Sequence, residues 1–359
     1  MKTYKIAILG GDGIGPEIMG SALSVLDKLQ AKFGFKTNRI HMDGGAEFYR
    51  KTGKDLQENG IETARATDAI LFGAMGLPDV RFPDGTEIAP HLTMRAEFGL
   101  FAGVRPVRRY PNTPSPLGSP EAENIDLVIL RESTEGLFAS RGKGTIENDA
   151  VAKDTMVITR ATCERLFDFA LELTRRRKEQ GRGKGRLTCV DKSNVFVSMA
   201  FFRKIFAERA HLSSGVNTDY AYVDAAALDL VKRPWEFDVM VMENMFGDIL
   251  SDLGGGLVGG MGMAPCAEIG LQNALFQPAH GTAPDIAGTG RANPTAMLVS
   301  TAMMLEWLGE QHNDETLTKA GVALDKAVYD AYADAEILPM EFGGPSDMQT
   351  VTDAIVSRL

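Results

Sequence analysis

The sequence has few cysteines and no long apolar run, and these absences exclude several classes of protein. Its 359 residues include only Cys163, Cys189 and Cys266, which are widely spaced and form no C-x-x-C pair. A disulfide framework and a zinc site are therefore not expected. No segment approaches the roughly 18 consecutive apolar residues of a membrane-spanning helix, and the apolar run Ile6–Leu9 is too short for a signal peptide. We expect a cytoplasmic protein that is not inserted in a membrane.

Positive charge is also in short supply. The chain has 38 lysines and arginines against 48 aspartates and glutamates, a formal net charge of −10. Such a protein has no overall attraction to nucleic acid or to an anionic membrane, so an anionic ligand must be bound by cations gathered locally. The 44% of hydrophobic residues suffice for a large core. At roughly 100–200 residues per domain, the length indicates two domains.

Short apolar runs alternate with longer amphipathic segments along the chain. Strands are predicted at Lys5–Leu9, Ala69–Phe72, Asp126–Leu130, Leu187–Val190 and Asp238–Met242. Helices are predicted at Pro16–Phe33, Arg160–Lys178, Ser198–Arg209, Asn244–Leu257, Pro294–Leu308 and Glu315–Ala333. This alternation predicts an α/β fold with a largely parallel sheet. The glycine run 254–260 interrupts a helical pattern and could mark a crossing between domains.

The segment Gly11–Glu17 suggests a strand, a turn and a helix that begins near Pro16. A dinucleotide phosphate loop is the obvious hypothesis. However, the spacing of Gly11, Gly13 and Gly15 is not G-x-G-x-x-G, and no G-K-[ST] follows. The segment therefore indicates a turn near a ligand-binding edge rather than an ordinary Rossmann phosphate loop.

Two carboxylates, Asp248 and Asp252, leave the same face of a predicted helix one turn apart. Like charges at this spacing repel one another, and the flanking apolar residues place the helix near the core, where unpaired carboxylates are costly. Mg²⁺ or Mn²⁺ would relieve this repulsion, and Asp224 could complete the ligand set. An exposed acidic face is the alternative.

Cationic side chains in three motifs could bind an anion. Arg95 and Arg105 lie close in sequence, and Arg131 ends a predicted strand, where side chains of an α/β sheet face the ligand crevice. Arginine binds carboxylates in a bidentate manner, although a surface salt bridge is the alternative for any single one. Lys192 follows another strand and is a candidate for proton transfer. His280 lies in a polar loop, 277–288, which could present its imidazole and backbone N–H groups to a nucleotide.

Seven ordered motifs together resemble the isocitrate/isopropylmalate dehydrogenase family, the β-decarboxylating dehydrogenases of 2-hydroxy acids. They are GDGIGPE, MRAEFGLFAGVRP, RESTEG, DKSNV, YVDAAAL, NMFGDILSDLGGGLVGGMG and HGTAPDIAGTGRANP, and they cover essentially the whole chain. The resemblance implies an isopropylmalate-dehydrogenase-like two-domain α/β fold, not a standard Rossmann domain. It implies a large, discontinuous cofactor-binding domain of residues 1–100 and 257–359. Residues 101–256 would form a smaller middle domain with the dimer contacts and the substrate and metal residues.

The resemblance also implies roles for the charged residues. Arg95, Arg105 and Arg131 would bind the substrate carboxylates. Asp248 and Asp252, with Asp224 of the partner subunit, would hold Mg²⁺ or Mn²⁺. Lys192 and Asp224 of the partner subunit would be the catalytic residues, with Lys192 taking part in proton transfer. The active protein is thus expected to be a homodimer with shared active sites.

Cofactor residues follow from the same resemblance. His280, Asp285 and Asn293 match adenosine-binding positions, and Asn194 matches a position near the nicotinamide. The Asp285 carboxylate can accept hydrogen bonds from ribose hydroxyls but would repel a 2′-phosphate, which favours NAD. Arg291 lies nearby in the sequence, and NADP is therefore kept as the alternative cofactor.

Phe138 and His91 depart from what many relatives carry. Phe138 stands where relatives typically have a tyrosine, and phenylalanine has no proton to donate to the enol; Gln277 likewise replaces a frequent glutamate. His91 occupies a position that often contacts the substrate side chain, and it favours a C3 substituent smaller or more polar than isopropyl.

The expected reaction is oxidative decarboxylation of a dicarboxylate or tricarboxylate 2-hydroxy acid, a 3-substituted or unsubstituted malate of the 3-isopropylmalate, tartrate or D-malate type. A catalytically weak regulatory or ligand-binding subunit and a non-decarboxylating dehydrogenase are the alternatives.

Overall fold

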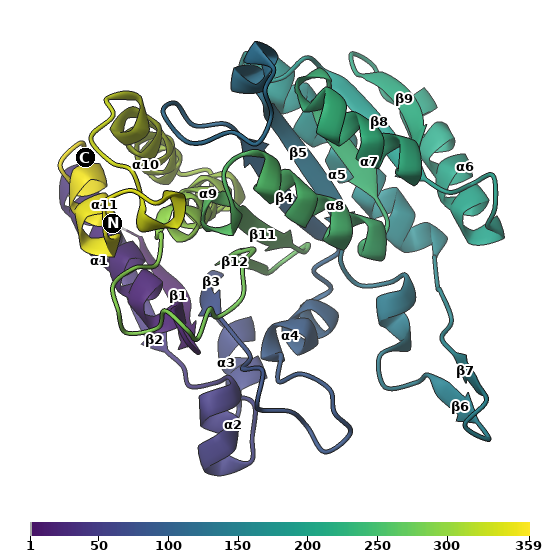
Figure 1. Ribbon diagram of the computed structural model, residues 1–359, viewed down its shortest axis with the longest axis horizontal. Coiled ribbons are helices and arrows are strands. Elements are labelled where there is room, and N and C mark those ends of the chain that lie inside the picture. The colour runs from purple at the N-terminus through teal and green to yellow at the C-terminus, as the bar shows by residue number, and fades with distance from the viewer. Residues whose placement is uncertain (1) are drawn as a thin grey trace. The chain divides into compact units, whose positions relative to one another are not determined.

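A computed structural model describes residues 2–359, which divide into two compact units (Figure 1). The first unit comprises the chain up to Gly99, the short segment Tyr110–Pro114, and Gly259–Leu359. The second comprises Leu100–Arg109 and Ser115–Val258. The chain returns to the first unit at Gly259, within the glycine-rich run 254–260. Gly259 and Gly260 adopt φ values of 128° and 145°, at which a residue with a side chain would be strained. In the part of the chain that the structure describes, no helix is long and apolar enough to cross a membrane.

A mixed sheet forms the centre of the first unit, in the order β2-β1-β3-β12-β11. Its strands are β1 (Thr3–Gly11), β2 (Lys36–His41), β3 (Ala69–Ala74), β11 (Pro265–Ile269) and β12 (Ala274–Pro278). All pairs are parallel except β11 with β12. Every residue of β3 is buried, as expected for a parallel strand that is covered on both faces.

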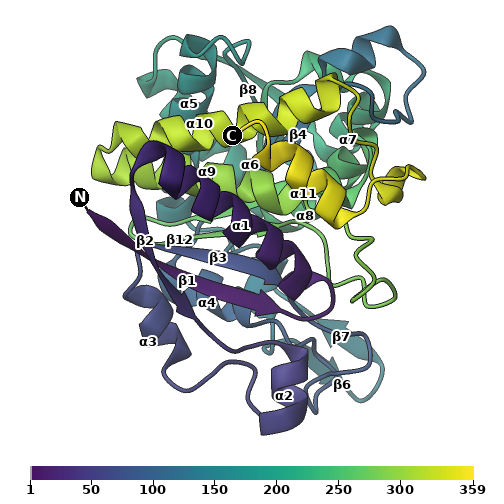
Figure 2. The ribbon, with the colours of Figure 1, turned by 90° about the vertical axis from the view of Figure 1, so that its left-hand side faces the viewer.

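The helices of this unit come from both terminal segments of the chain. They are α1 (Gly15–Phe33), α2 (Ala46–Thr52), α3 (Gly60–Arg65), α4 (Pro90–Phe98), α9 (Thr295–His312), α10 (Glu315–Ala333) and α11 (Met348–Val356), with short 3₁₀ helices at Met261–Met263 and Met340–Phe342. Figure 2 shows α1, α9, α10 and α11 side by side, and α9 also packs on β11 and β12. Asn313 ends α9 in the left-handed conformation, and Asp314 caps α10. Segments far apart in sequence thus share one core.

Five strands form the centre of the second unit, in the order β4-β5-β10-β8-β9. Its strands are β4 (Ala102–Arg108), β5 (Asp126–Glu132), β8 (Arg186–Asp191), β9 (Asn217–Tyr222) and β10 (Val239–Met242). Its helices are α5 (Arg160–Glu179), α6 (Val197–Leu212), α7 (Val223–Lys232) and α8 (Asn244–Leu257), with 3₁₀ helices at Pro120–Asn124, Leu137–Ser140 and Pro234–Glu236. A separate hairpin joins β6 (Thr145–Glu147) and β7 (Val151–Lys153).

Parallel pairing brings the carboxyl ends of three strands of the second unit to one edge. In the register, Arg131 of β5 lies opposite Met242 of β10, and Met242 lies opposite Val190 of β8. The loops that follow these strands therefore begin side by side. They carry several of the predicted site residues.

Candidate functional site

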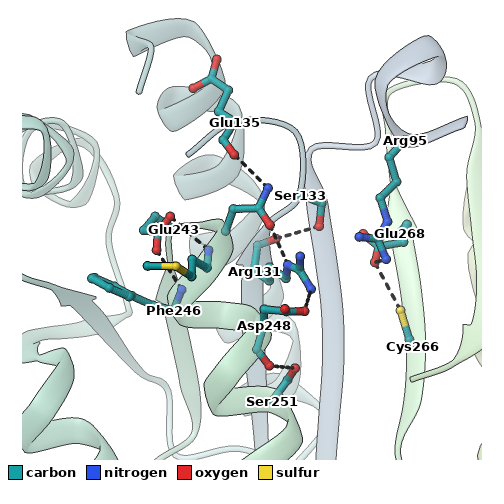
Figure 3. Close-up of polar contacts among 12 residues, drawn as sticks. Arg95, Arg131, Ser133, Glu135, Glu243, Phe246, Asp248, Ser251, Cys266 and Glu268 are labelled. Atoms are coloured by element: carbon teal, nitrogen blue, oxygen red, sulfur yellow. Dashed lines mark hydrogen bonds and ion pairs between the residues drawn. The ribbon is translucent and has the colours of Figure 1, made fainter. Parts of the chain in front are cut away.

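Arg131 at the end of β5 is fixed by two side chains of helix α8. Its Nε donates to Asn244 Oδ1 at 2.8 Å, and its Nη1 pairs with the Asp248 carboxylate (Figure 3). Glu243 begins the helix, because its carboxylate accepts the N–H groups of Met245 and Phe246 at 3.1 and 2.8 Å. A carboxylate there satisfies donors that the first helical turn leaves unpaired. The guanidinium is buried and rigid, which suits recognition of a planar carboxylate.

Gly247 allows α8 to approach Arg131 this closely. A Cβ at this position would lie 2.5 Å from Arg131 Cβ and 2.7 Å from Arg131 Cγ. Gly256 lies in the same helix, and a Cβ there would meet nothing within 4 Å. The two glycines therefore provide a matched pair of substitutions.

Gly247→Ala is expected to destabilise the protein by about 1–3 kcal/mol, because the methyl group overpacks the contact between α8 and β5. Gly256→Ala should instead be neutral or stabilising by about 0.5–1 kcal/mol, because alanine favours the helix. Differential scanning calorimetry of both variants gives the comparison. Equal melting temperatures for the two variants would contradict the close approach at Gly247.

Asp248 and Asp252 lie one turn apart on α8, as predicted. Partial burial, followed by the charge of Asp248, raises the pKa of Asp252, while Arg105 and Arg131 oppose this shift. Two carboxylates whose mutual repulsion the arginines offset only in part are a donor set that suits a hard divalent cation. Between residues 2 and 359, however, no three Asp, Glu, His or Cys side chains gather as a metal-binding group. A single chain therefore offers two of the three predicted metal ligands together.

The third carboxylate, Asp224, pairs instead with Lys192. Lys192 Nζ lies 2.6 Å from Asp224 Oδ1, and this hydrogen bond is the main cause that lowers the pKa of Asp224. Asp224 lies in the first turn of α7, where the helix dipole favours an anion. The predicted residues of the second unit thus fall into two groups, Arg131 with Asp248 and Lys192 with Asp224.

The backbone before Lys192 is held by an ion pair between a buried carboxylate and a half-buried arginine, which the sequence pattern did not predict. Asp191 is fully buried and accepts two hydrogen bonds from Arg203 of α6, at 2.6 and 3.0 Å. The Arg203 guanidinium also lies over the rings of Tyr220 and Tyr222, 4.8 and 5.1 Å from their centroids. An acidic residue at the end of an apolar strand indicates that a cationic side chain pairs with it. The spacing of residues in the sequence does not show which cation this is.

His280 follows β12 in the first unit and is prepared as a hydrogen-bond acceptor. Its Nδ1 lies 2.8 Å from Gly281 O, which requires the proton on Nδ1. Burial lowers the pKa of His280, so the ring is neutral. Its Nε2 is buried and meets no hydrogen-bond partner within the described residues. This nitrogen can accept from an amino donor, such as the exocyclic amine of adenine.

Other predicted cofactor residues differ in exposure. Asp285 is exposed in the loop after His280, and Asn194 is exposed in the loop after β8. Asn293 is buried, where its amide donates to Glu341 Oε2 at 3.0 Å and its Oδ1 accepts from Thr295 N at 3.1 Å. Gln277 is buried on β12.

The glycine-rich segment Gly11–Glu17 supports this loop. Ile14 N donates to Thr282 O at 2.9 Å, and Glu17 accepts the N–H groups of Gly288 and Gly290. Gly13 has a φ of 56°, and a Cβ on it would lie 2.1 Å from Thr282 O. The close approach of backbone that the glycines permit is to another loop of the protein, which explains why their spacing is not that of a phosphate loop.

Two further predicted residues lie on α4 of the first unit. Arg95 Nη2 pairs with Glu268 Oε1 of β11 at 2.7 Å. The His91 ring meets the edge of Phe72 with centroids 5.6 Å apart. In the second unit, the guanidinium of Arg131 lies 5.0 Å from the centroid of Phe138, so this aromatic ring contacts the same arginine as Asp248.

Glu132, next to Arg131, is buried and accepts three hydrogen bonds from the loop after it. Thr134 donates from its backbone and its hydroxyl at 2.7 and 2.6 Å, and Glu135 N donates at 2.7 Å. Burial raises the pKa of Glu132 to about 7, although the three donors oppose the shift. A carboxyl group with a raised pKa in the folded state stabilises the protein below its ordinary pKa and loses that contribution as the pH rises.

Glu132→Gln is therefore expected to flatten the dependence of stability on pH. Between pH 4.5 and 7 the free energy of unfolding of the wild-type protein should fall by up to about 3 kcal/mol more than that of the variant. Urea unfolding at several pH values measures the difference between the two proteins. Parallel stability curves would show that Glu132 titrates normally.

Known proteins share the sequence pattern and the fold of this chain. The sequence model of a family described as isocitrate/isopropylmalate dehydrogenase matches residues 5–355. The 3-isopropylmalate/3-methylmalate dehydrogenase of Methanocaldococcus jannaschii is 39% identical over 318 residues, which are 88% of this chain and 90% of that protein. The 3-isopropylmalate dehydrogenase of Pseudoalteromonas translucida is 39% identical over 99% of both chains. The crystal structure of an isocitrate dehydrogenase from Methylococcus capsulatus aligns over 99% of both chains, with a TM-score of 0.85 and 32% identity. The predicted fold is thereby confirmed.

Proposed function

The chain belongs to the isocitrate/isopropylmalate dehydrogenase family, and we propose that it catalyses the NAD- and Mg²⁺- or Mn²⁺-dependent oxidative decarboxylation of a 3-substituted or unsubstituted malate. Membership makes the chain an enzyme, a β-decarboxylating dehydrogenase. The observation that carries the finer proposal is the pairing of Arg131 with Asp248, beside Asp252, at the carboxyl edge of the sheet. This arrangement combines a carboxylate-binding cation with oxygen ligands for a metal.

Asp248 and Asp252, with Asp224 of the partner subunit, would hold the divalent cation. When bound, the cation stabilises negative charge that develops on the substrate oxygens, and NAD accepts the hydride. Arg95, Arg105 and Arg131 bind the substrate carboxylates. Each of the three is buried, so little conformational freedom is lost when the substrate binds.

Lys192 moves a proton at Nζ. Its ammonium already donates to Asp224, so the proton is held at a defined atom. Removal of the substrate hydroxyl proton and protonation of the enol both need a group of this kind. In its neutral form, Lys192 Nζ accepts the hydroxyl proton, and the ammonium that results donates a proton to the enol. Phe138 cannot share the second step, and Lys192 is therefore the group that we assign to both.

A homodimer with shared sites accounts for the two separate groups. Within one chain, Lys192 pairs with Asp224, and Arg131 pairs with Asp248. Leu228, Val231 and Ile249 are large apolar side chains exposed on α7 and α8, the helices that carry these groups. Exposed apolar side chains on neighbouring elements favour a protein interface, and the interface would bring Lys192 and Asp224 of one subunit to the arginines of the other.

NAD is the cofactor we assign, with the adenosine portion bound by His280, Asp285 and Asn293 and the nicotinamide near Asn194. The neutral imidazole of His280 supplies an acceptor, and the exposed carboxylate of Asp285 opposes a 2′-phosphate. Cys163, Cys189 and Cys266 are buried and form no disulfide among the described residues, which suits a reducing compartment such as the cytoplasm.

The test follows NADH formation with Mn²⁺ against 3-isopropylmalate, D-malate, tartrate, isocitrate and homoisocitrate, with CO₂ measured in parallel. We expect NADH and CO₂ in equal amounts from one or more of them. NADH without CO₂ would favour a non-decarboxylating dehydrogenase. No turnover, with NAD and Mn²⁺ bound, would favour a regulatory subunit.

Phe138→Tyr tests the second candidate, the weak regulatory subunit, which the ring of Phe138 against Arg131 favours. A tyrosine hydroxyl supplies a proton, and general acids contribute about 10²–10⁴-fold. The substitution should raise the rate of CO₂ release by about tenfold or more if the missing hydroxyl limits turnover. An unchanged rate in steady-state assays would show that Lys192 suffices.

A further inference from the structure

A buried carboxylate, Glu268, holds one of the three proposed substrate arginines. Arg95 is 5% exposed on α4, and its Nη2 lies 2.7 Å from Oε1 of Glu268, whose side chain is 0% exposed on β11 (Figure 3). Both residues belong to the first unit. The pair therefore joins a helix near the start of the chain to a strand near its end.

Burial of Glu268 is costly and calls for an explanation. All five residues of β11 are buried, and its other side chains are apolar or the thiol of Cys266, which lies 3.5 Å from Glu268 Oε1. An ionised carboxylate in such a strand is stable only when it is paired and hydrogen-bonded. An apolar residue at this position of β11 would be stable without a partner. We therefore explain the carboxylate by its ion pair with Arg95 rather than by the packing of the strand.

The ion pair leaves part of the guanidinium available. Arg95 Nε is buried and has no acceptor in the described residues, while Nη2 is bound to Glu268. An arginine presents several N–H donors in a rigid fork. Glu268 therefore fixes the orientation of the fork and leaves a buried donor, Nε, without a partner of its own.

Glu268 also places a buried carboxylate 2.7 Å from the arginine it orients. The attraction of Arg95 for an anion is therefore weaker than that of an arginine without this carboxylate. Each additional carboxylate on the substrate consequently gains less attraction and meets the buried negative charge of Glu268. Selection against a ligand by repulsion is a common means of specificity.

We propose that Glu268 is a positioning residue for Arg95 and that its charge makes the site prefer dicarboxylate malates, whose C3 substituent is uncharged, over tricarboxylates. This inference rests on the proposed function, because it requires Arg95 to bind a substrate carboxylate. It narrows the substrate class that the family alone leaves open.

The experiment compares Glu268→Gln and Glu268→Ala with the wild-type enzyme. The amide oxygen of glutamine can still accept from Arg95 Nη2, so Glu268→Gln removes the charge and keeps the orientation. We expect its kcat/KM for isocitrate and homoisocitrate, relative to 3-isopropylmalate and D-malate, to rise by about tenfold through KM. Glu268→Ala removes the orientation as well, and KM for every substrate should rise by about tenfold or more with little change in kcat.

Glu315→Gln is the matched control. Glu315 lies on α10 of the same unit, is largely exposed and pairs with Lys319 on the surface, so the same change of atoms and charge should leave the substrate ratio unaltered. An unchanged ratio in Glu268→Gln would overturn the selection. An unchanged KM in folded Glu268→Ala would overturn the positioning role. A KM for 3-isopropylmalate and D-malate that is as high in Glu268→Gln as in Glu268→Ala would overturn it as well. If the wild-type enzyme turns over and the variants keep its KM values and substrate ratio, this inference alone is refuted. If the wild-type protein shows no turnover, the proposed function is refuted and the inference with it.

Discussion

Replacing Asp248 with asparagine is expected to lower Mn²⁺-dependent NADH formation by about 1,000-fold. The amide keeps the size of the side chain but removes the negative charge that binds a divalent cation. A cation that stabilises developing charge is worth several kcal/mol, and about 4 kcal/mol corresponds to that factor. Titration of Mn²⁺ by electron paramagnetic resonance should show weaker binding in the same variant, independently of turnover.

Asp168→Asn provides the control for Asp248→Asn. Asp168 lies in the same unit, its side chain is 50% exposed like that of Asp248, and it also pairs with an arginine, Arg209. Its replacement removes one surface ion pair, which is worth about 0–1 kcal/mol, and should leave turnover unchanged. If Asp248→Asn retained wild-type activity and Mn²⁺ affinity, the proposed metal site would be wrong.

Replacing Lys192 with methionine is expected to lower kcat by about 1,000-fold, because methionine keeps the apolar stem but carries no proton. Lys204→Met, at an exposed position on α6, is the matched control and should keep full activity. The loss should fall on kcat rather than on KM for the hydroxy acid. Steady-state kinetics of both variants separates the two constants.

The two inactive variants should restore activity when they are mixed. In a dimer of one Lys192→Met chain and one Asp248→Asn chain, one shared site contains both substitutions and the other contains neither. Random exchange of subunits makes about half of the dimers mixed, so about a quarter of the wild-type activity should return. Refolding the two chains together and measuring NADH formation tests this directly. No recovery in mixtures that exchange subunits would show that each chain supplies its own complete site.

The sequence was sufficient to predict residues at the ends of strands, but not their long-range partners. Arg131, Lys192 and the pair Asp248 and Asp252 could be identified because strand ends and helical spacing are local properties. Glu268 was missed because β11 contains a proline and an acid and does not read as a strand. Its pairing with Arg95 depends on how two distant segments meet, which no local pattern encodes.

For the glycine-rich segment Gly11–Glu17, too, the local structure could be predicted but the long-range contacts could not. Its turn and the helix after it were predictable from Pro16 and the glycines. That Glu17 and Ile14 would hold the loop after His280 was not, since the two segments lie at opposite ends of the chain. The side chain of Asn293, predicted to face adenosine, binds Glu341 and Thr295 N within the protein. Whether it also meets the cofactor stays a prediction.

The discontinuous first unit has a consequence for synthesis on the ribosome. Strand β3 pairs with β1 on one side and with β12 on the other, and β12 begins only at Ala274. At about 5–20 residues per second, the intervening stretch of about 200 residues takes about 10–40 s to synthesise. During that time one edge of an entirely apolar strand has no partner, and such an edge promotes aggregation. The N-terminal segment should therefore depend on a chaperone until the last third of the chain has emerged, whereas the second unit, complete by Val258, can fold before it.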